Sequence, residues 1–255
     1  MAKIDVSKIV GDMQKLYAKD KKVQSLITTG DTVKSVYTIK DGIPLTPGSP
    51  LQLILALTVL PYNKVVQFAG KPDSGKSTTA TELMVSAQKN GDTVIICDSE
   101  DKFDSARFTA CGGDASELLL VKTNEILKGA ELVRKYINAI KAQSNEAKIL
   151  VVWDSVGGSQ SRSHAERELD SEKHAQPGQD AKENGSVMKM LVSLINKYPD
   201  TIAVYLANQT YAKIGFMQKG DAAAGGTKIE YHSSLIVMLK RIKVLTKVVK
   251  GVTTK

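Results

Sequence analysis

Residues 70–78 of this 255-residue chain read GKPDSGKST and follow an apolar run. Gly70 and Gly75 permit backbone conformations that a side chain would forbid. Successive N–H groups at the start of a helix can then surround a phosphate, which Lys76 reaches while Ser77 offers its hydroxyl to Mg²⁺. A glycine turn without a ligand is the alternative. The strand-like run before the motif and the helix-like run after it favour a magnesium-bound nucleotide.

Acidic residues follow two other apolar runs. Asp154 ends KILVVWDS, where a carboxylate can hold Mg²⁺ through water beside Ser77. Asp98, Glu100 and Asp101 lie in VIICDSED, and a carboxylate near the terminal phosphate can orient and deprotonate water. For the second cluster, a solvated turn is the alternative.

Amides and histidines give weaker signals. Asn208 and Gln209 end YLANQT, where they could bind the terminal phosphate and report its loss to the next loop, or be an ordinary polar strand end. The histidines have no paired spacing, and we interpret them as non-catalytic. They are His164, His174 and His232.

The elements that must position these residues alternate between apolar strands and helices. We expect strands at residues 65–69, 92–99, 115–123, 148–155, 201–209, 234–241 and 243–250, and helices at 78–91, 129–143 and 187–199. Apolar strands between helices predict an α/β fold with a mostly parallel sheet covered on both faces. The short link between the last two strands predicts an antiparallel edge.

The N-terminus has a different pattern. Residues 4–22 are expected to form a short amphipathic helix that packs on its own domain or on a neighbouring subunit. The apolar positions at helical spacing are Ile9, Met13, Leu16 and Tyr17. We divide the chain into an N-terminal helix and linker, residues 1–44, and a core, residues 45–255.

Composition narrows the class of protein. The net charge is +8, and residues 236–255 are rich in Lys and Arg and contain no acidic residue, which favours polyanionic partners. No apolar run is long enough for a membrane span, and no secretory signal is visible. Cys97 and Cys111 lack metal-ligand spacing. We interpret both as reduced packing residues of a cytoplasmic protein.

Two long polar stretches, residues 157–186 and 210–226, follow strand ends, where open α/β sheets bind ligands. Ile214, Phe216 and Met217 in the second stretch could wedge between the bases of single-stranded DNA, or simply anchor the loop on the core.

Together these segments resemble the RecA recombinase family over residues 45–250, nearly the whole ATPase core. The matching segments are the motif at 70–78, SEDKFD, DSVGG, NQ and KIGFMQKGDAAAGGTKIEYHSSLIVMLKR. The long polar first loop is more similar to phage recombinases of the UvsX type. The resemblance implies a RecA-like P-loop core with ATP and Mg²⁺ bound between subunits of a helical filament. Such a filament coats single-stranded DNA, pairs it with a homologous duplex and exchanges strands with DNA-stimulated ATP hydrolysis.

The resemblance also implies roles for individual residues. Glu100 would activate water, Gln209 would sense the γ-phosphate, and Lys76 and Lys250 (perhaps with Lys247) would contact ATP, Lys250 from the next subunit. Nucleotide would bind at Gly70, Asp73, Ser74, Gly75, Lys76, Ser77, Thr78, Asp104 and Arg107. The metal residues would be Ser77 and Asp154. DNA would bind at Arg162, Lys213, Ile214, Gly215, Gly225, Gly226 and Thr227.

The chain departs from the family pattern at several positions. Arg107 stands where a tyrosine usually stacks on adenine, and Tyr211 and Glu230 replace residues that are often basic. Tyr231 matches an interface aromatic. The C-terminal region that gathers duplex DNA is expected to be absent or removed.

Three other functions stay open. A RecA-fold ring motor such as a helicase would form hexameric rings. A scaffold that uses ATP only as an assembly switch would retain its activity after Glu100→Gln. A small-molecule kinase is the weakest alternative, since no acceptor-site feature is seen.

Overall fold

The computed structural model describes residues 5–30, 41–161, 178–212, 221–224, 226–240, 247–249 and 252–254. The chain divides into two compact units, Met1–Ile39 and Lys40–Lys255.

The N-terminal unit contains α1 (Val6–Leu16) and α2 (Lys21–Gln24). Asp5 begins α1 by accepting a hydrogen bond from the Lys8 N–H, and Asp20 caps α2 in the same way. The predicted amphipathic helix is therefore present, although shorter than residues 4–22. All its named apolar side chains are exposed, from 40% for Met13 to 76% for Leu16.

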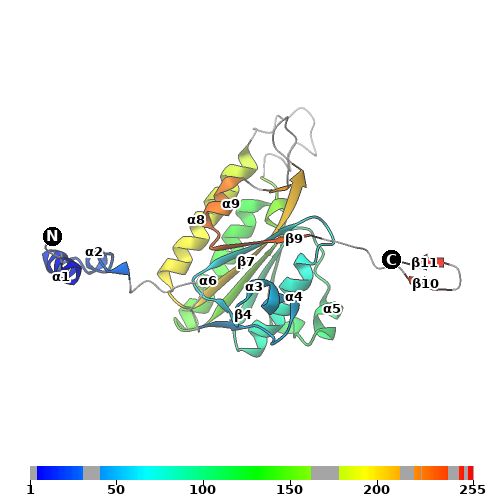
Figure 1. The fold of residues 1–255 in the computed structure, drawn as a ribbon, viewed down its shortest axis with the longest axis horizontal. Helices are drawn as coiled ribbons and strands as arrows, with labels where there is room; N and C mark the ends of the chain where they lie inside the picture. Colours follow the sequence, from blue (N-terminus) through cyan, green and yellow to red (C-terminus); the bar gives the residue numbers. More distant parts are fainter. Residues whose placement is uncertain are drawn as a thin grey trace. The chain divides into compact units, whose positions relative to one another are not determined.

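The second unit is built on six parallel strands among the described residues, in the order β5-β4-β6-β7-β3-β9 (Figure 1). The strands are β3 (Val65–Gly70), β4 (Thr93–Asp98), β5 (Leu118–Lys122), β6 (Ile149–Asp154), β7 (Ile202–Ala212) and β9 (Leu235–Leu239). β8 (Asp221–Ala223) pairs antiparallel with the end of β7. The predicted α/β class and mostly parallel sheet are confirmed.

Helices cover both faces of the sheet because every central strand is apolar on both sides. On one face lie α3 (Pro50–Leu55), α4 (Lys76–Lys89) and α5 (Ser105–Ala110), whose apolar residues share a core with Phe68 and Val152. On the other lie α6 (Ile126–Gln143), α8 (Gln179–Lys197) and α9 (Thr227–His232), packed around Trp153 and Leu206. The remaining short elements are β1 (Gly42–Pro44), β2 (Val59–Pro61), η2 (Ala115–Glu117) and η3 (Val156–Gly158).

The predicted antiparallel pairing between the last two strands, residues 234–241 and 243–250, is wrong. β9, in the first of them, pairs parallel with β3, with Val66 opposite Leu235, and ends the order of the main sheet among the described residues. β10 (Lys247–Val249) instead pairs antiparallel with β11 (Val252–Thr254) in a separate two-stranded sheet.

Two polar stretches contain more regular structure than expected. α8 begins at Gln179, inside the predicted loop of residues 157–186, and β7 and β8 extend into residues 210–226. α9 packs along the first turns of α8: a Cβ on Gly185 would lie 2.4 Å from Lys228 Cδ. Gly185, one of the small residues of the predicted loop, is therefore a packing residue at a close contact between two helices.

α3 leaves two apolar side chains at the surface, with Leu53 72% exposed and Ile54 44% exposed. Both cysteines are free, but only Cys97 is buried, so the packing role expected for Cys111 is wrong. Among the described residues, no helix is both long and apolar enough to cross a bilayer.

Candidate functional site

The loop between β3 and α4 lies at the carboxyl end of the sheet. Gly70 ends β3, and a Cβ there would lie 2.5 Å from both the Leu239 carbonyl oxygen and the Ser74 hydroxyl oxygen. Asp73 and Gly75 have positive φ angles of 60° and 100°. Among the residues that the structure describes, no side chain caps the first N–H groups of α4. The loop thus wraps tightly and leaves these donors for an anion.

Lys76 lies at the start of α4 and is only 8% exposed. Its Nζ donates to the carbonyl oxygens of Gly70 and Lys71, each at 2.9 Å. Burial lowers the pKa of Lys76, whereas the nearby carboxylates of Asp154 and Glu100 act in the opposite direction. The ammonium group is therefore held over the loop, where an added negative charge would favour its charged form.

Asp154 ends β6, and its Oδ2 accepts a hydrogen bond of 2.7 Å from the Ser77 hydroxyl. Burial raises the pKa of Asp154, as do the charges of Glu100 and Asp98, while the Ser77 hydrogen bond and Lys76 lower it. A cation beside a buried carboxylate whose pKa is raised stabilises the charged form of that carboxylate. The two residues predicted to hold the metal are thus in direct contact.

Glu100 follows β4 and accepts three side-chain hydrogen bonds. Its Oε1 accepts from the Ser155 hydroxyl at 2.5 Å and from Gln209 Nε2 at 2.7 Å, and its Oε2 accepts from Lys102 Nζ at 2.5 Å. Burial alone would raise the pKa of Glu100, but these bonds lower it below its ordinary value. Glu100 is therefore ionised at neutral pH and positioned by residues from three parts of the chain.

The segment carrying Glu100 is shaped by Asp98. Its Oδ1 accepts from the backbone N–H groups of Glu100 and Lys102, both at 3.2 Å, and its Oδ2 accepts from the Phe103 N–H at 2.8 Å. Asp101 lies outside this arrangement and forms an exposed ion pair with Lys122. Within the predicted acidic cluster, Asp98 is thus an organising residue.

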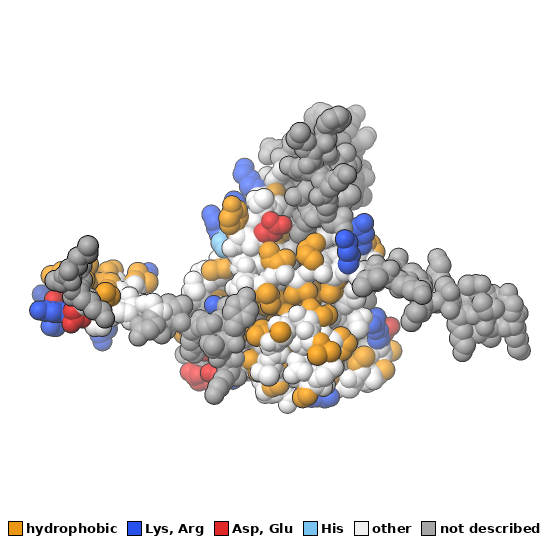
Figure 2. All heavy atoms as spheres, in the orientation of Figure 1, with side chains coloured by type: hydrophobic (Ala, Val, Ile, Leu, Met, Phe, Trp, Pro, Cys, Tyr) orange, Lys and Arg blue, Asp and Glu red, His pale blue; other side chains and the backbone are white. Residues whose placement is uncertain are grey.

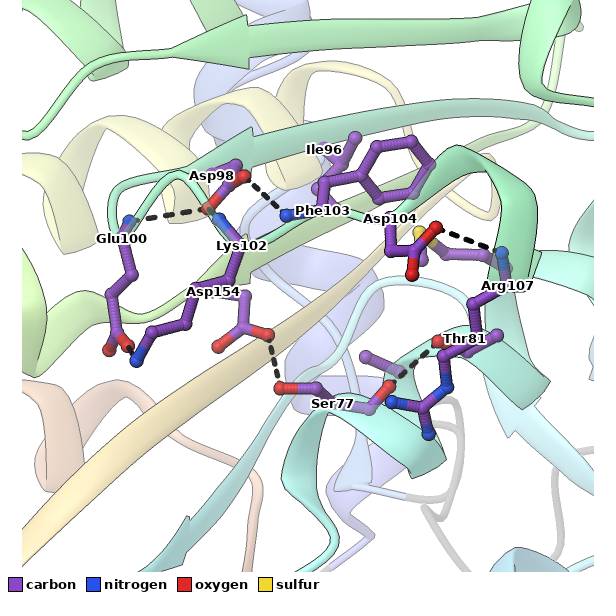
Figure 3. Close-up of a pocket in the computed structure, with 12 residues that line it drawn as sticks. Ser77, Thr81, Ile96, Asp98, Glu100, Lys102, Phe103, Asp104, Arg107 and Asp154 are labelled. Atoms are coloured by element: carbon purple, nitrogen blue, oxygen red, sulfur yellow. Dashed lines mark hydrogen bonds and ion pairs between the residues drawn. The ribbon is translucent and has the colours of Figure 1, made fainter. Parts of the chain in front are cut away.

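A cavity beside the loop is lined by residues from α4, β4, α5 and β6 (Figure 3). Asp104 and Arg107 both face it, as the nucleotide prediction requires. The Asp104 carboxylate caps α5 by accepting from the Arg107 N–H at 3.0 Å, and Arg107 Nη2 donates to the Thr78 hydroxyl at 3.0 Å. The guanidinium group therefore lies next to the first turn of α4.

Gln209 is tied to the segment that follows it in the chain. The Ala224 N–H donates to the Gln209 carbonyl oxygen at 2.8 Å, and Asn208 Nδ2 donates to the Ala224 carbonyl oxygen at 2.9 Å. Asn208 is fully buried. The end of β7 thus connects Glu100 with the segment that begins α9.

The predicted residues fall into three groups. Gly226, with a φ of 90°, and Thr227 stand at the start of α9, where a Cβ on Gly226 would lie 2.9 Å from Ala181 Cβ. The predictions for Arg162, Lys213, Ile214, Gly215, Gly225 and Lys250 lie outside the described residues. The remaining predicted residues surround the carboxyl ends of β3, β4, β6 and β7.

Three residues that contact Glu100 had no role predicted from the sequence motifs. Ser155 and Lys102 bind its carboxylate, and a Cβ on Gly158 would lie 2.8 Å from its Oε1. The only local signal was the pair of glycines after Asp154 and Ser155. A close approach between a backbone and a side chain is a reason for glycine at such a position.

The residues present fit a magnesium-bound nucleotide. The Ser74 hydroxyl is buried in the loop without a hydrogen-bond partner among the described residues. Ser77 and Asp154 supply the hard oxygen ligands that Mg²⁺ prefers. In the described part of the chain, no cluster of three or more His, Cys, Asp and Glu side chains could hold a metal.

A parallel sheet with this loop between β3 and α4, and with Asp154 at the end of a nearby strand, defines the P-loop class of nucleotide-binding proteins. The sequence comparison is more specific, since the RecA N-terminal domain family matches residues 7–255. The chain therefore belongs to the RecA family, and the resemblance seen in its motifs is confirmed.

Several curated proteins are similar to this chain. Protein RecA of Roseiflexus castenholzii is 28% identical over 209 residues, covering 81% of this chain and 56% of the relative. Protein RecA of Chloroflexus aurantiacus is 26% identical over 206 residues, covering 80% and 55%. Protein RecA of Lactobacillus delbrueckii subsp. bulgaricus is 28% identical over 229 residues, covering 89% and 66%. The chain spans little more than half the length of the first two relatives.

Proposed function

We propose that this protein is an ATP-dependent homologous recombination protein of the cytoplasm. In this proposal it forms helical filaments on single-stranded DNA, pairs that strand with a homologous duplex, promotes strand exchange and hydrolyses ATP in response to DNA. The observation that carries the proposal is the 2.7 Å hydrogen bond from Gln209 Nε2 to Glu100 Oε1. It joins a carboxylate suited to activating water to the strand that leads into the predicted DNA-binding segment.

The hydrolytic roles follow from charge and position. Glu100 is ionised and can accept a proton from water. Mg²⁺–ATP, when bound, supplies the phosphoanhydride bond that is broken and the negative charge that the site must balance. Lys76 would balance part of that charge, and Ser77 and Asp154 would hold the metal. Arg107, beside Thr78, would contact the base or sugar in place of the family's tyrosine.

The coupling to DNA uses the end of β7. Gln209 binds Glu100 through its side chain and Ala224 through its carbonyl oxygen. A change in the position of Gln209 would therefore be transmitted to the loop between β7 and α9. In the proposal that loop binds DNA through Lys213, Ile214 and the glycines before α9, with Arg162 from the first loop.

Exposed apolar surface supports assembly with further copies of the chain. α1 exposes Ile9 and Leu16, and residues 1–44 are proposed as the segment that docks on the next subunit. On the core, Figure 2 shows hydrophobic side chains gathered where Figure 1 places β9 and α3. Ile236 is 40% exposed and Met238 is 53% exposed there. In the filament, Lys250 would reach ATP bound to the neighbouring copy.

The test measures ATP hydrolysis with and without single-stranded DNA and images the same samples. Strong stimulation together with DNA-coating helical filaments supports the proposal. DNA-independent hydrolysis with rings or monomers overturns it, and rings would favour a ring motor. Glu100→Gln should abolish turnover while Mg²⁺–ATP still binds. If Glu100→Gln retains strand exchange, ATP acts only as an assembly switch.

A further inference from the structure

Lys102 lies in the candidate site, but neither the sequence motif nor the family resemblance assigned it a role. Its ammonium group lies 2.5 Å from Glu100 Oε2. Its backbone N–H is held by Asp98 Oδ1 at 3.2 Å, whereas its side chain is 76% exposed. The backbone is therefore fixed at the edge of the site, while the long side chain has room to change conformation.

The ammonium group of Lys102 faces the phosphate loop as well as Glu100. Lys102, Ser77 and Asp154 line the same cavity, and Figure 3 shows the Lys102 amine at the Glu100 carboxylate with Asp154 nearby. The hydrogen bond and charge of Glu100 raise the pKa of Lys102, and the carboxylates of Asp154 and Asp73 add to this effect. The same cation disfavours the charged form of Lys76. The two ammonium groups therefore act on each other electrostatically, and both are influenced by the carboxylates of Asp154 and Glu100.

We propose that Lys102 is a γ-phosphate ligand supplied by the same subunit. Without nucleotide its ammonium group neutralises Glu100, and with ATP bound it turns to the terminal phosphate and releases Glu100 Oε2 for water. This inference rests on the proposed ATPase function and deepens it.

The two carboxylate oxygens of Glu100 have different partners, so movement of the Lys102 ammonium group from Glu100 to the phosphate would affect hydrolysis. Oε1 already accepts hydrogen bonds from Ser155 and Gln209, so Oε2 is the oxygen better placed to accept from water. A lysine bound to Oε2 makes that oxygen less basic. The terminal phosphate carries more negative charge than a carboxylate and competes for the cation. Glu100 Oε2 thereby becomes free to accept a hydrogen bond from water only when a triphosphate occupies the site.

An ordinary surface ion pair is the simpler explanation, and the chain contains a matched example. Lys122 and Asp101 also pair at 2.5 Å, with side chains that are 56% and 73% exposed. Neither residue lines the cavity. Exposed pairs of this kind contribute little to stability. Lys122→Ala therefore removes an equivalent ion pair from a neighbouring position without removing a charge from the cavity.

The experiment compares Lys102→Ala, Lys102→Arg and Lys122→Ala in the full chain. Dissociation constants are measured by calorimetry with Mg²⁺–ADP and with a Mg²⁺-bound, non-hydrolysable ATP analogue. For Lys102→Ala, we expect the constant for the ATP analogue to rise about tenfold, as for one lost charged hydrogen bond. The constant for ADP should change less than about twofold, because ADP lacks the terminal phosphate. Lys102→Arg should retain part of the discrimination, and Lys122→Ala should match the wild type.

Equal weakening of both nucleotides, or no change in either, overturns the inference. Tighter binding of the ATP analogue by Lys102→Ala also overturns it, because Lys102 would then only inhibit. A different result marks failure of the proposed function itself: wild-type protein that binds neither nucleotide, or binding that is unaffected by Lys76→Ala. The two failures are therefore distinguishable.

Discussion

Gly158→Ala is the sharpest test of how Glu100 is positioned. The new Cβ would lie 2.8 Å from Glu100 Oε1, 2.8 Å from the Ser155 hydroxyl oxygen and 3.0 Å from Glu100 Cγ. Gly158 does not have a positive φ, so alanine introduces no backbone strain there. The substitution therefore acts mainly by displacing the carboxylate.

The size of the effect follows from these contacts. Oε1 must move by about 0.6 Å to reach an ordinary contact of 3.4 Å with the methyl group. The same oxygen accepts the bonds from Ser155 and Gln209, so both are stretched together. Each hydrogen bond to a charged acceptor contributes about 1.5–3 kcal/mol when intact. Losing roughly half of each amounts to about 1.5–3 kcal/mol in total, or roughly 10- to 150-fold in kcat if the loss is felt fully in the transition state.

The assay measures hydrolysis with and without single-stranded DNA, ADP affinity and the free energy of unfolding for Gly158→Ala. We expect kcat to fall about 100-fold, with ADP affinity retained and the free energy of unfolding lowered by about 1.5–3 kcal/mol at most, the share lost from the two hydrogen bonds. Gly185→Ala is the control. Its Cβ would lie 2.4 Å from the flexible Lys228 side chain, and its nearest contacts do not include Glu100. Its DNA-independent hydrolysis should match the wild type. A kcat for Gly158→Ala within about threefold of wild type would refute the positioning argument.

Two further predictions concern stability. Burial raises the pKa of Asp154, so ionisation of this carboxyl weakens the folded state as pH rises through its folded pKa. Asp154→Asn should therefore raise the melting temperature at pH 7 in EDTA and abolish the added stabilisation by Mg²⁺–ATP; a lower melting temperature in EDTA would contradict this. The fully buried Tyr205 hydroxyl donates to the Lys76 carbonyl oxygen at 2.8 Å. Tyr205→Phe should cost about 1–2 kcal/mol, or roughly 2–8 °C in melting temperature. The exposed control Tyr231→Phe should be neutral, and equal melting curves would show that the buried bond contributes nothing.

Much of the site was predictable because its first part is local in the chain. The phosphate loop occupies nine consecutive residues, and its glycines and lysine have roles that short-range geometry dictates. The acidic residues could be placed at strand ends because apolar strands are easy to recognise. Their roles in hydrolysis stay predictions.

Contacts between distant residues could not be predicted from the motifs. Glu100 and Gln209 are 109 residues apart in sequence, and Ser155 and Glu100 are 55 apart. Lys102 was overlooked because exposed lysines are common and only its partner distinguishes it. The partner of β10 was also predicted wrongly, because a short link between two apolar runs does not show which of them belongs to the main sheet.

The sequence by itself determined the fold class, the phosphate loop and the membership of the RecA family, because local periodicity and motif spacing encode them. Only the tertiary structure decided which strand ends are neighbours. The order β4-β6-β7-β3 places Gly70 opposite Gln209 and Asp98 opposite Asp154. Strand order and register in a parallel sheet depend on packing between segments far apart in the chain, and those contacts set the surroundings of Glu100.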